Sequence, residues 1–90
     1  MPTQRARRIE ELTDLARKGI KREQLIQAAS YFPLSRDAWP LRSIAMRYPA
    51  VRAVVIEAKR RYQVTDDTAE SYAEAVFVAL KPKLPAAADK

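Results

Sequence analysis

Apolar side chains in this chain of 90 residues recur every three or four positions along successive segments, which is the spacing of an amphipathic α-helix. Helix-breaking residues interrupt this spacing at Gly19, Pro33, Pro40, Pro49 and Pro82. Proline lacks a backbone donor and glycine loses much conformational entropy, so one long helix is excluded. We expect an all-α fold: a compact bundle of four to five short helices with a flexible C-terminal tail. Residues 1–81 would form a single helical domain and residues 82–90 a disordered tail rich in proline, alanine and lysine.

The expected helices run from about Gln4 to Lys18, Arg22 to Tyr31, Asp37 to Tyr48, Pro49 to Tyr62, and from the turn at 64–67 to Pro82. Gly19 follows two basic residues, so we expect it to end the first helix with a positive φ. Lys21 offers no acceptor to cap the second helix. Pro49 suits the first position of the fourth helix. Asp67 with Glu70 resembles a capping box at the start of the fifth.

The residue types also limit the chemistry, because the chain has no cysteine, no histidine and one glycine. This composition excludes disulfides, thiolate nucleophiles, zinc–sulfur sites, the Ser-His triad and glycine-rich phosphate loops. The paired carboxylates fall on polar helix faces or at a helix start, where solvation and capping explain them. An oxygen-only magnesium site at Asp66, Asp67 and Glu70 is the alternative. We expect a protein that is not an enzyme and has no catalytic residue, metal or cofactor.

Neither a membrane span nor a secretion signal is evident. No apolar run approaches the roughly 18–20 residues that cross a bilayer. The basic segment 1–8 is not followed by the apolar stretch of a signal peptide. We expect a cytoplasmic protein without membrane contact.

Charge is the first indication of function. Lysine and arginine number 17 against 11 aspartates and glutamates, which gives a formal net charge of +6. The net charge is +3 over residues 1–31, +5 over residues 32–63 and −2 over residues 64–90. A basic front two-thirds is typical of a domain that binds a polyanion. Nucleic acid is the first expectation, an acidic protein surface is the second, and a basic protein without a polyanion is the third.

Arginine supplies eleven of the basic residues, and its planar guanidinium group binds phosphates and carboxylates bidentately. A coding bias that enriches arginine and alanine together is the alternative explanation. In the fourth helix, periodicity places Arg52, Lys59 and Arg60 around Ile56, away from the core. This pattern predicts a contact patch, with a solvated face and one exposed isoleucine as the alternative. The residues expected to contact DNA phosphates or another partner are Arg5, Arg7 and Arg8 on an N-terminal arm, and Arg42, Arg47, Arg52, Ile56, Lys59, Arg60 and Arg61.

The segment Tyr62-Gln63-Val64-Thr65-Asp66-Asp67-Thr68-Ala69-Glu70-Ser71-Tyr72 resembles the turn and recognition-helix start of bacterial helix-turn-helix regulators. In such a regulator, Asp66, Asp67 and Glu70 would meet DNA, and carboxylates repel phosphates. We therefore expect DNA to contact the fourth helix and the N-terminal arm instead. The leading hypothesis is a small, basic, non-enzymatic DNA-binding accessory or regulatory protein, from a bacterium or a mobile element.

The alternative function is a protein–protein interaction module. It would be an adaptor or inhibitor, encoded by a phage or plasmid, that docks on an acidic surface of a larger complex. Its anchors would be Ile56, Trp39 and Val78. For Trp39, a core position is favoured over an interface position. Val78 points outward from the fifth helix, so a homodimer seam through Val78 and Ala75 is a further alternative.

Overall fold

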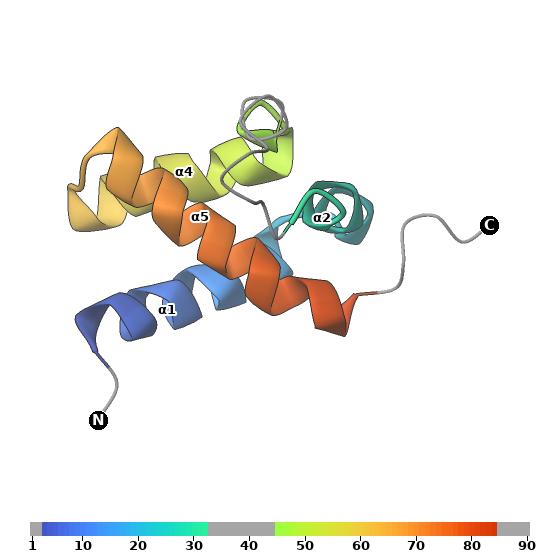
Figure 1. Cartoon of the computed structure of the whole chain (residues 1–90), viewed down its shortest axis with the longest axis horizontal. Coiled ribbons are helices and arrows are strands. Elements are labelled where there is room, and N and C mark those ends of the chain that lie inside the picture. Colours follow the sequence, from blue (N-terminus) through green and yellow to red (C-terminus); the bar gives the residue numbers. More distant parts are fainter. Residues whose placement is uncertain (1–2, 33–44, 85–90) are drawn as a thin grey trace.

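The computed structural model describes residues 3–32 and 45–84, and it confirms the all-α prediction. Four α-helices make up a compact globule: α1 (Gln4–Gly19), α2 (Arg22–Ala29), α4 (Pro49–Tyr62) and α5 (Asp66–Leu80) (Figure 1). A short 3₁₀ helix, η1 (Lys81–Lys83), follows α5. These residues contain no strand. Most of the helix expected over residues 37–48 lies outside the described residues.

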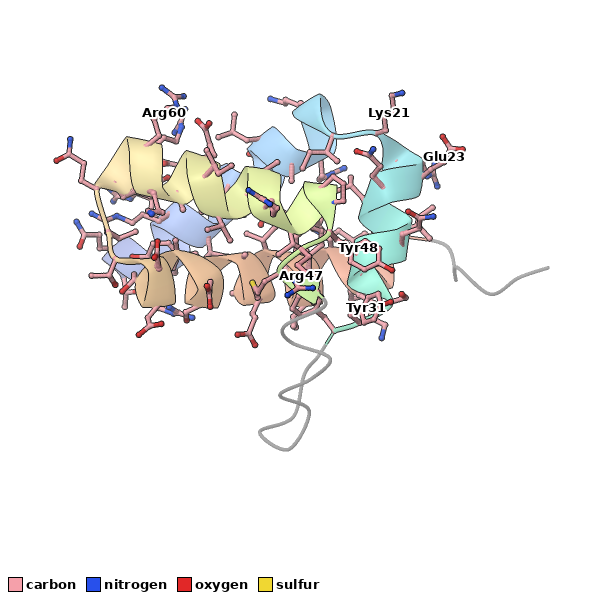
Figure 2. The ribbon with its side chains drawn as sticks, turned by 90° about the horizontal axis from the view of Figure 1, so that it is seen from above. Lys21, Glu23, Tyr31, Arg47, Tyr48 and Arg60 are labelled. Atoms are coloured by element: carbon pink, nitrogen blue, oxygen red, sulfur yellow. The ribbon has the colours of Figure 1, made fainter. Side chains whose placement is uncertain are left out.

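Helix α5 is the centre of the fold. It packs against α1, α2, α4 and η1, and Figure 1 shows it crossing in front of α1 and α4. Six of its apolar residues are buried, whereas Val78 and Ala79 are exposed, so its apolar character reflects its central position. Helices α4 and α5 are joined by the short turn at residues 63–65 and run in broadly opposite directions (Figure 2).

The core consists of the expected apolar stripes. The largest fully buried side chains are Phe32, Phe77, Leu12, Leu80, Val51 and Val76. The rings of Phe32 and Phe77 stack with their centroids 5.5 Å apart, which joins the end of α2 to α5. Small residues lie where the helices meet, because Ala28, Ala58 and Ala73 are fully buried. Short side chains at these contacts let the helix axes approach closely.

The helix starts agree with the sequence in two places and differ in a third. Pro49 occupies the first turn of α4, and no side chain caps α2 at Lys21, as expected. The capping box at Asp67 and Glu70 is wrong. The N-cap is Thr65, two residues earlier, and its hydroxyl accepts from the backbone N–H of Thr68 at 3.3 Å.

The first helix ends within one residue of the prediction, but the positive φ expected at Gly19 is wrong. Gly19 is the last helical residue of α1 and its φ is not positive. The chain leaves the helix through Ile20, which is extended and whose N–H bonds to the carbonyl of Ala16 at 3.0 Å. This conformation lets the Ile20 side chain pack against the core. Among the residues the structure describes, the only non-glycine residue with positive φ is Gln63, which ends α4 at φ 53°.

The C-terminal part of the described chain is attached to the core. Pro82 and Lys83 belong to η1, and the half-buried Leu84 packs against the core. The Lys81 ammonium donates to the carbonyl of Phe32 at the end of α2. The segment 85–90 of the expected tail lies outside the described residues.

Candidate binding surfaces

The predicted contact residues do not form one surface. Arg42, like Trp39, lies outside the described residues. Arg5, Arg7 and Arg8 lie in the first two turns of α1 rather than on a separate arm. The start of α1 and the end of α4 lie at the same end of the molecule (Figure 1), so these arginines share that end with residues 59–61. Arg47 lies at the other end of α4 from Arg60 (Figure 2).

Two tyrosines hold two of the α1 arginines. The Arg8 guanidinium lies 4.7 Å from the centroid of the Tyr62 ring and donates to the Tyr72 hydroxyl at 3.0 Å. The Arg5 guanidinium lies 5.5 Å from the centroid of the Tyr72 ring. The rings of Tyr62 and Tyr72 meet edge to face, with their centroids 6.2 Å apart. These contacts join α1 to α4 and α5. They give Arg5 and Arg8 a structural role that the sequence did not predict.

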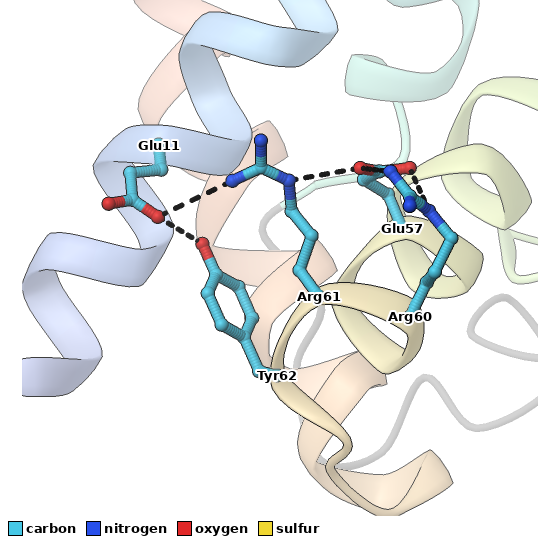
Figure 3. Close-up of polar contacts among 5 residues, drawn as sticks. All are labelled: Glu11, Glu57, Arg60, Arg61 and Tyr62. Carbon is cyan, nitrogen blue, oxygen red and sulfur yellow. Dashed lines mark hydrogen bonds and ion pairs between the residues drawn. The ribbon is translucent and has the colours of Figure 1, made fainter.

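Two glutamates hold the arginines at the end of α4 (Figure 3). Glu57 accepts from Arg60 at 2.7 Å and from Arg61 at 3.0 Å. Glu11 on α1 accepts from the Tyr62 hydroxyl and lies 3.7 Å from Arg61. The hydrogen bonds from Arg60, and next those from Arg61, hold the pKa of Glu57 below its usual value. Burial, followed by the hydrogen bond to Glu11, raises the pKa of Tyr62.

The predicted patch around Ile56 is therefore less basic than expected. Ile56 is 57% exposed, which confirms that it points away from the core. Arg52 is exposed and has no ion-pair partner within residues 3–32 and 45–84. Lys59, however, pairs with Asp66, and Arg60 pairs with Glu57. A hollow of about 270 Å³ beside Ile56 also includes the carboxylates of Asp66 and Glu70.

An apolar groove between α1 and α4 was not predicted. Its volume is about 260 Å³, and it is lined by Leu12, Leu15, Ala16, Gly19, Ile20, Ala53, Val54 and Glu57. Small residues on both helices leave this space, since Gly19 on α1 and Ala53 on α4 are exposed. Ile56 follows Ala53 by one helical turn but lines the other hollow, so the groove and Ile56 lie on neighbouring faces of α4. The pair of small residues on two neighbouring helices was the signal in the sequence.

A second unpredicted feature is the basic corner between α1 and α2. Arg17, Lys18, Lys21 and Arg22 lie within six residues, and all four are exposed. In the described part of the chain none of them has an ion-pair partner. The cations over residues 17–22 are visible in the sequence, but they span the boundary between two helices and follow no helical periodicity. The periodic pattern lies on α4 instead.

Comparisons with known proteins identify no relative: the chain matches no protein-family model and resembles no curated protein and no solved structure. No helix in the described ranges has both the length and the apolar character required to span a membrane. Residues 3–32 and 45–84 also contain no group of three acidic side chains that would hold a metal ion. The all-α fold class is established by the structure itself. The surfaces described above are the basis for a functional proposal.

Proposed function

We propose that this protein is a non-enzymatic interaction module that docks on an acidic surface of a larger complex. The observation that carries the proposal is the apolar groove between α1 and α4. The exposed Ile56, which lies on the neighbouring outer face of α4 beside a second hollow, adds an apolar side chain of the kind that anchors interfaces. The opposite side of both helices is already covered by α5, so a partner would meet them on the groove side.

The occupant that fits is an amphipathic helix with an acidic polar face. A groove between two helices accepts the apolar stripe of a third, with anchors spaced three or four residues apart. The cation Lys21 projects from the edge of the molecule (Figure 2), next to the groove residue Ile20, whereas Arg60 on the same edge is paired with Glu57. Lys18 follows Leu15 by one turn of α1, on the side of the groove. Acidic side chains on the partner would meet these cations at the rim.

DNA binding is the second candidate. The basic corner at residues 17–22 favours it, since cations that form no ion pair among the described residues are available to phosphates. The contacts would then lie on α1 and α2, and not at the end of α4 as the sequence predicts. We place this function second because a rigid duplex cannot enter the groove, and the exposed Ile56 would have no use.

Ala53→Arg separates the two candidates, because its expected effects have opposite signs. The exposed position tolerates a long side chain that fills the groove, and arginine suits a helix. We expect it to weaken binding of a labelled synthetic leucine- and glutamate-bearing amphipathic helix by about tenfold or more. Affinity for a short DNA duplex should stay the same or rise, because the substitution adds a positive charge. Fluorescence anisotropy measures both, with Ala79→Arg on exposed α5 surface as the matched control.

Ile56 gives a second measurement on the same probes. Ile56→Ala should cost about 1–2 kcal/mol of peptide binding and leave DNA binding unchanged. The second candidate is favoured if neither Ala53→Arg nor Ile56→Ala changes peptide binding and if DNA binding weakens steeply as the salt concentration rises. A dimer in sedimentation experiments that Ala53→Arg dissociates would mean that a second copy of the chain fills the groove.

A further inference from the structure

A hollow of about 250 Å³ opens on a different face, between α1, α2 and η1. Three cationic side chains line it, each from a different element: Arg17 from α1, Arg22 from α2 and Lys83 from η1. Figure 1 shows α2 next to the end of α5, from which η1 continues. The hollow thus joins residues that are far apart in the sequence, and nothing in the composition of segment 81–90 indicates it.

No carboxylate neutralises these three cations. None lines the hollow, and across residues 3–32 and 45–84 none of the three has an ion-pair partner. The cations at the end of α4 differ, since Arg60 and Arg61 are both bound to Glu57. A concave surface lined by one sign of charge concentrates the electrostatic field, so the hollow attracts anions.

The rest of the hollow is apolar. Leu25 and Leu80 are buried in the core and reach its floor, and the half-buried Leu84 lies at its side. A bare inorganic anion would use the cations and leave this apolar surface in contact with water. A ligand with an anionic group joined to an apolar or aromatic body would cover both parts.

We propose that this hollow binds the phosphate group of a small phosphomonoester whose organic part covers Ile20 and Leu84, the two half-buried apolar residues that line it. Two guanidinium groups and an ammonium match the three terminal oxygens of a phosphomonoester, since arginine binds such groups bidentately and lysine binds them as a point charge. The hollow and the groove between α1 and α4 have one lining residue in common, Ile20, which carries no charge. They share no cation. The proposal therefore does not depend on the docking function.

The test is an NMR titration with inorganic phosphate and with phenyl phosphate at constant ionic strength. Saturable amide shifts should centre on Arg17, Arg22 and Lys83, and phenyl phosphate should bind more tightly than inorganic phosphate. The double variant Arg17→Gln/Lys83→Gln should lose about tenfold or more in affinity. The matched variant Lys18→Gln/Lys21→Gln removes the same charge from the same corner outside the hollow, and its affinity should stay within about threefold. All four positions are exposed, so unchanged thermal unfolding is expected for both variants.

Three outcomes would overturn the proposal. Equal losses in both double variants, with shifts spread over every basic residue, mean an adventitious ion only. Phenyl phosphate that binds no better than inorganic phosphate contradicts the apolar part of the site. If neither probe saturates but a DNA duplex binds and Arg17→Gln/Lys83→Gln weakens it, these cations serve a nucleic acid backbone instead.

Discussion

The end of α4 and the corner between α1 and α2 are both rich in cations, but their environments are opposite. At the end of α4, Arg60 and Arg61 are bound to Glu57, and Arg8 lies on the Tyr62 ring. At the α1–α2 corner, Arg17 and its basic neighbours have no acidic partner among the described residues. The first region holds helices together, and the second is available to an external anion.

This difference shows that the number of cations in a segment does not measure the positive charge it offers to a partner. The pattern on α4 was clearer in the sequence, because its cations surround an outward-facing isoleucine. Glu57, which pairs with Arg60 and Arg61, lies one turn earlier in the same helix, but the other carboxylates are harder to see, since Glu11 comes from another helix and Asp66 from beyond the turn. The free cations lie where no periodic pattern marks them.

The largest test of the comparison removes the aromatic support of the α4 end. Tyr72→Ala should lower the free energy of unfolding by about 3–5 kcal/mol, because a buried ring and its contacts with Arg5 and Arg8 are lost. Tyr72→Phe should cost about 1 kcal/mol, since it removes only the hydroxyl that accepts from Arg8. Urea unfolding measures both. Equal losses in the two variants would mean that the polar contact, and not the ring, holds this end together.

A smaller effect compares two arginines of the same helix. Arg8→Ala should destabilise the protein by about 1–2 kcal/mol, because it removes a cation–π contact and a hydrogen bond. Arg17→Ala should change stability by no more than about 0.5 kcal/mol. Thermal unfolding of the two variants gives the contrast directly. Similar losses at both positions would contradict the division into a structural end and a free corner.

The smallest effect is a pH dependence at Glu57. The arginines lower the pKa of this carboxyl in the folded state, so its ionised form stabilises the fold above the unfolded pKa, about 4.3. This contribution is lost as the pH falls through the folded pKa. The stability difference between wild type and Glu57→Gln should be less than about 1 kcal/mol at pH 7 and should vanish in acid. A difference that stays constant down to pH 3 would mean that the carboxyl charge is not involved.

Much of the fold was predictable because apolar spacing and breakers act locally. The spacing located the four described helices within about two residues, and α2 ends early, at Ala29 instead of Tyr31. It also identified the outward direction of Ile56 and Val78. The errors lie at helix ends, where a single hydrogen bond determines which residue caps the helix. Thr65 rather than Asp67 caps α5, because its extended backbone presents the hydroxyl to the N–H of Thr68.

The binding surfaces were less predictable because they depend on contacts between distant segments. The groove requires Gly19 and Ala53 to face each other, and the phosphate hollow requires Lys83 to approach Arg17. Neither pair is related by helical periodicity. Arg8 donates a hydrogen bond to Tyr72, 64 positions away in the sequence. No pattern within α1 reveals that the Arg8 guanidinium already has this partner.

The central position of α5 also determines when this chain can fold during its synthesis. Helix α5 follows the other described helices in the sequence, and it supplies Phe77, which packs on Phe32, and Tyr72, which binds Arg8. A nascent chain that has emerged only through α4 can form the contacts among α1, α2 and α4, but the apolar faces that α5 covers stay exposed. Ribosomes add roughly 5–20 residues per second, so we expect this state to last on the order of a second until α5 has emerged. During that interval the uncovered faces would be open to chaperones.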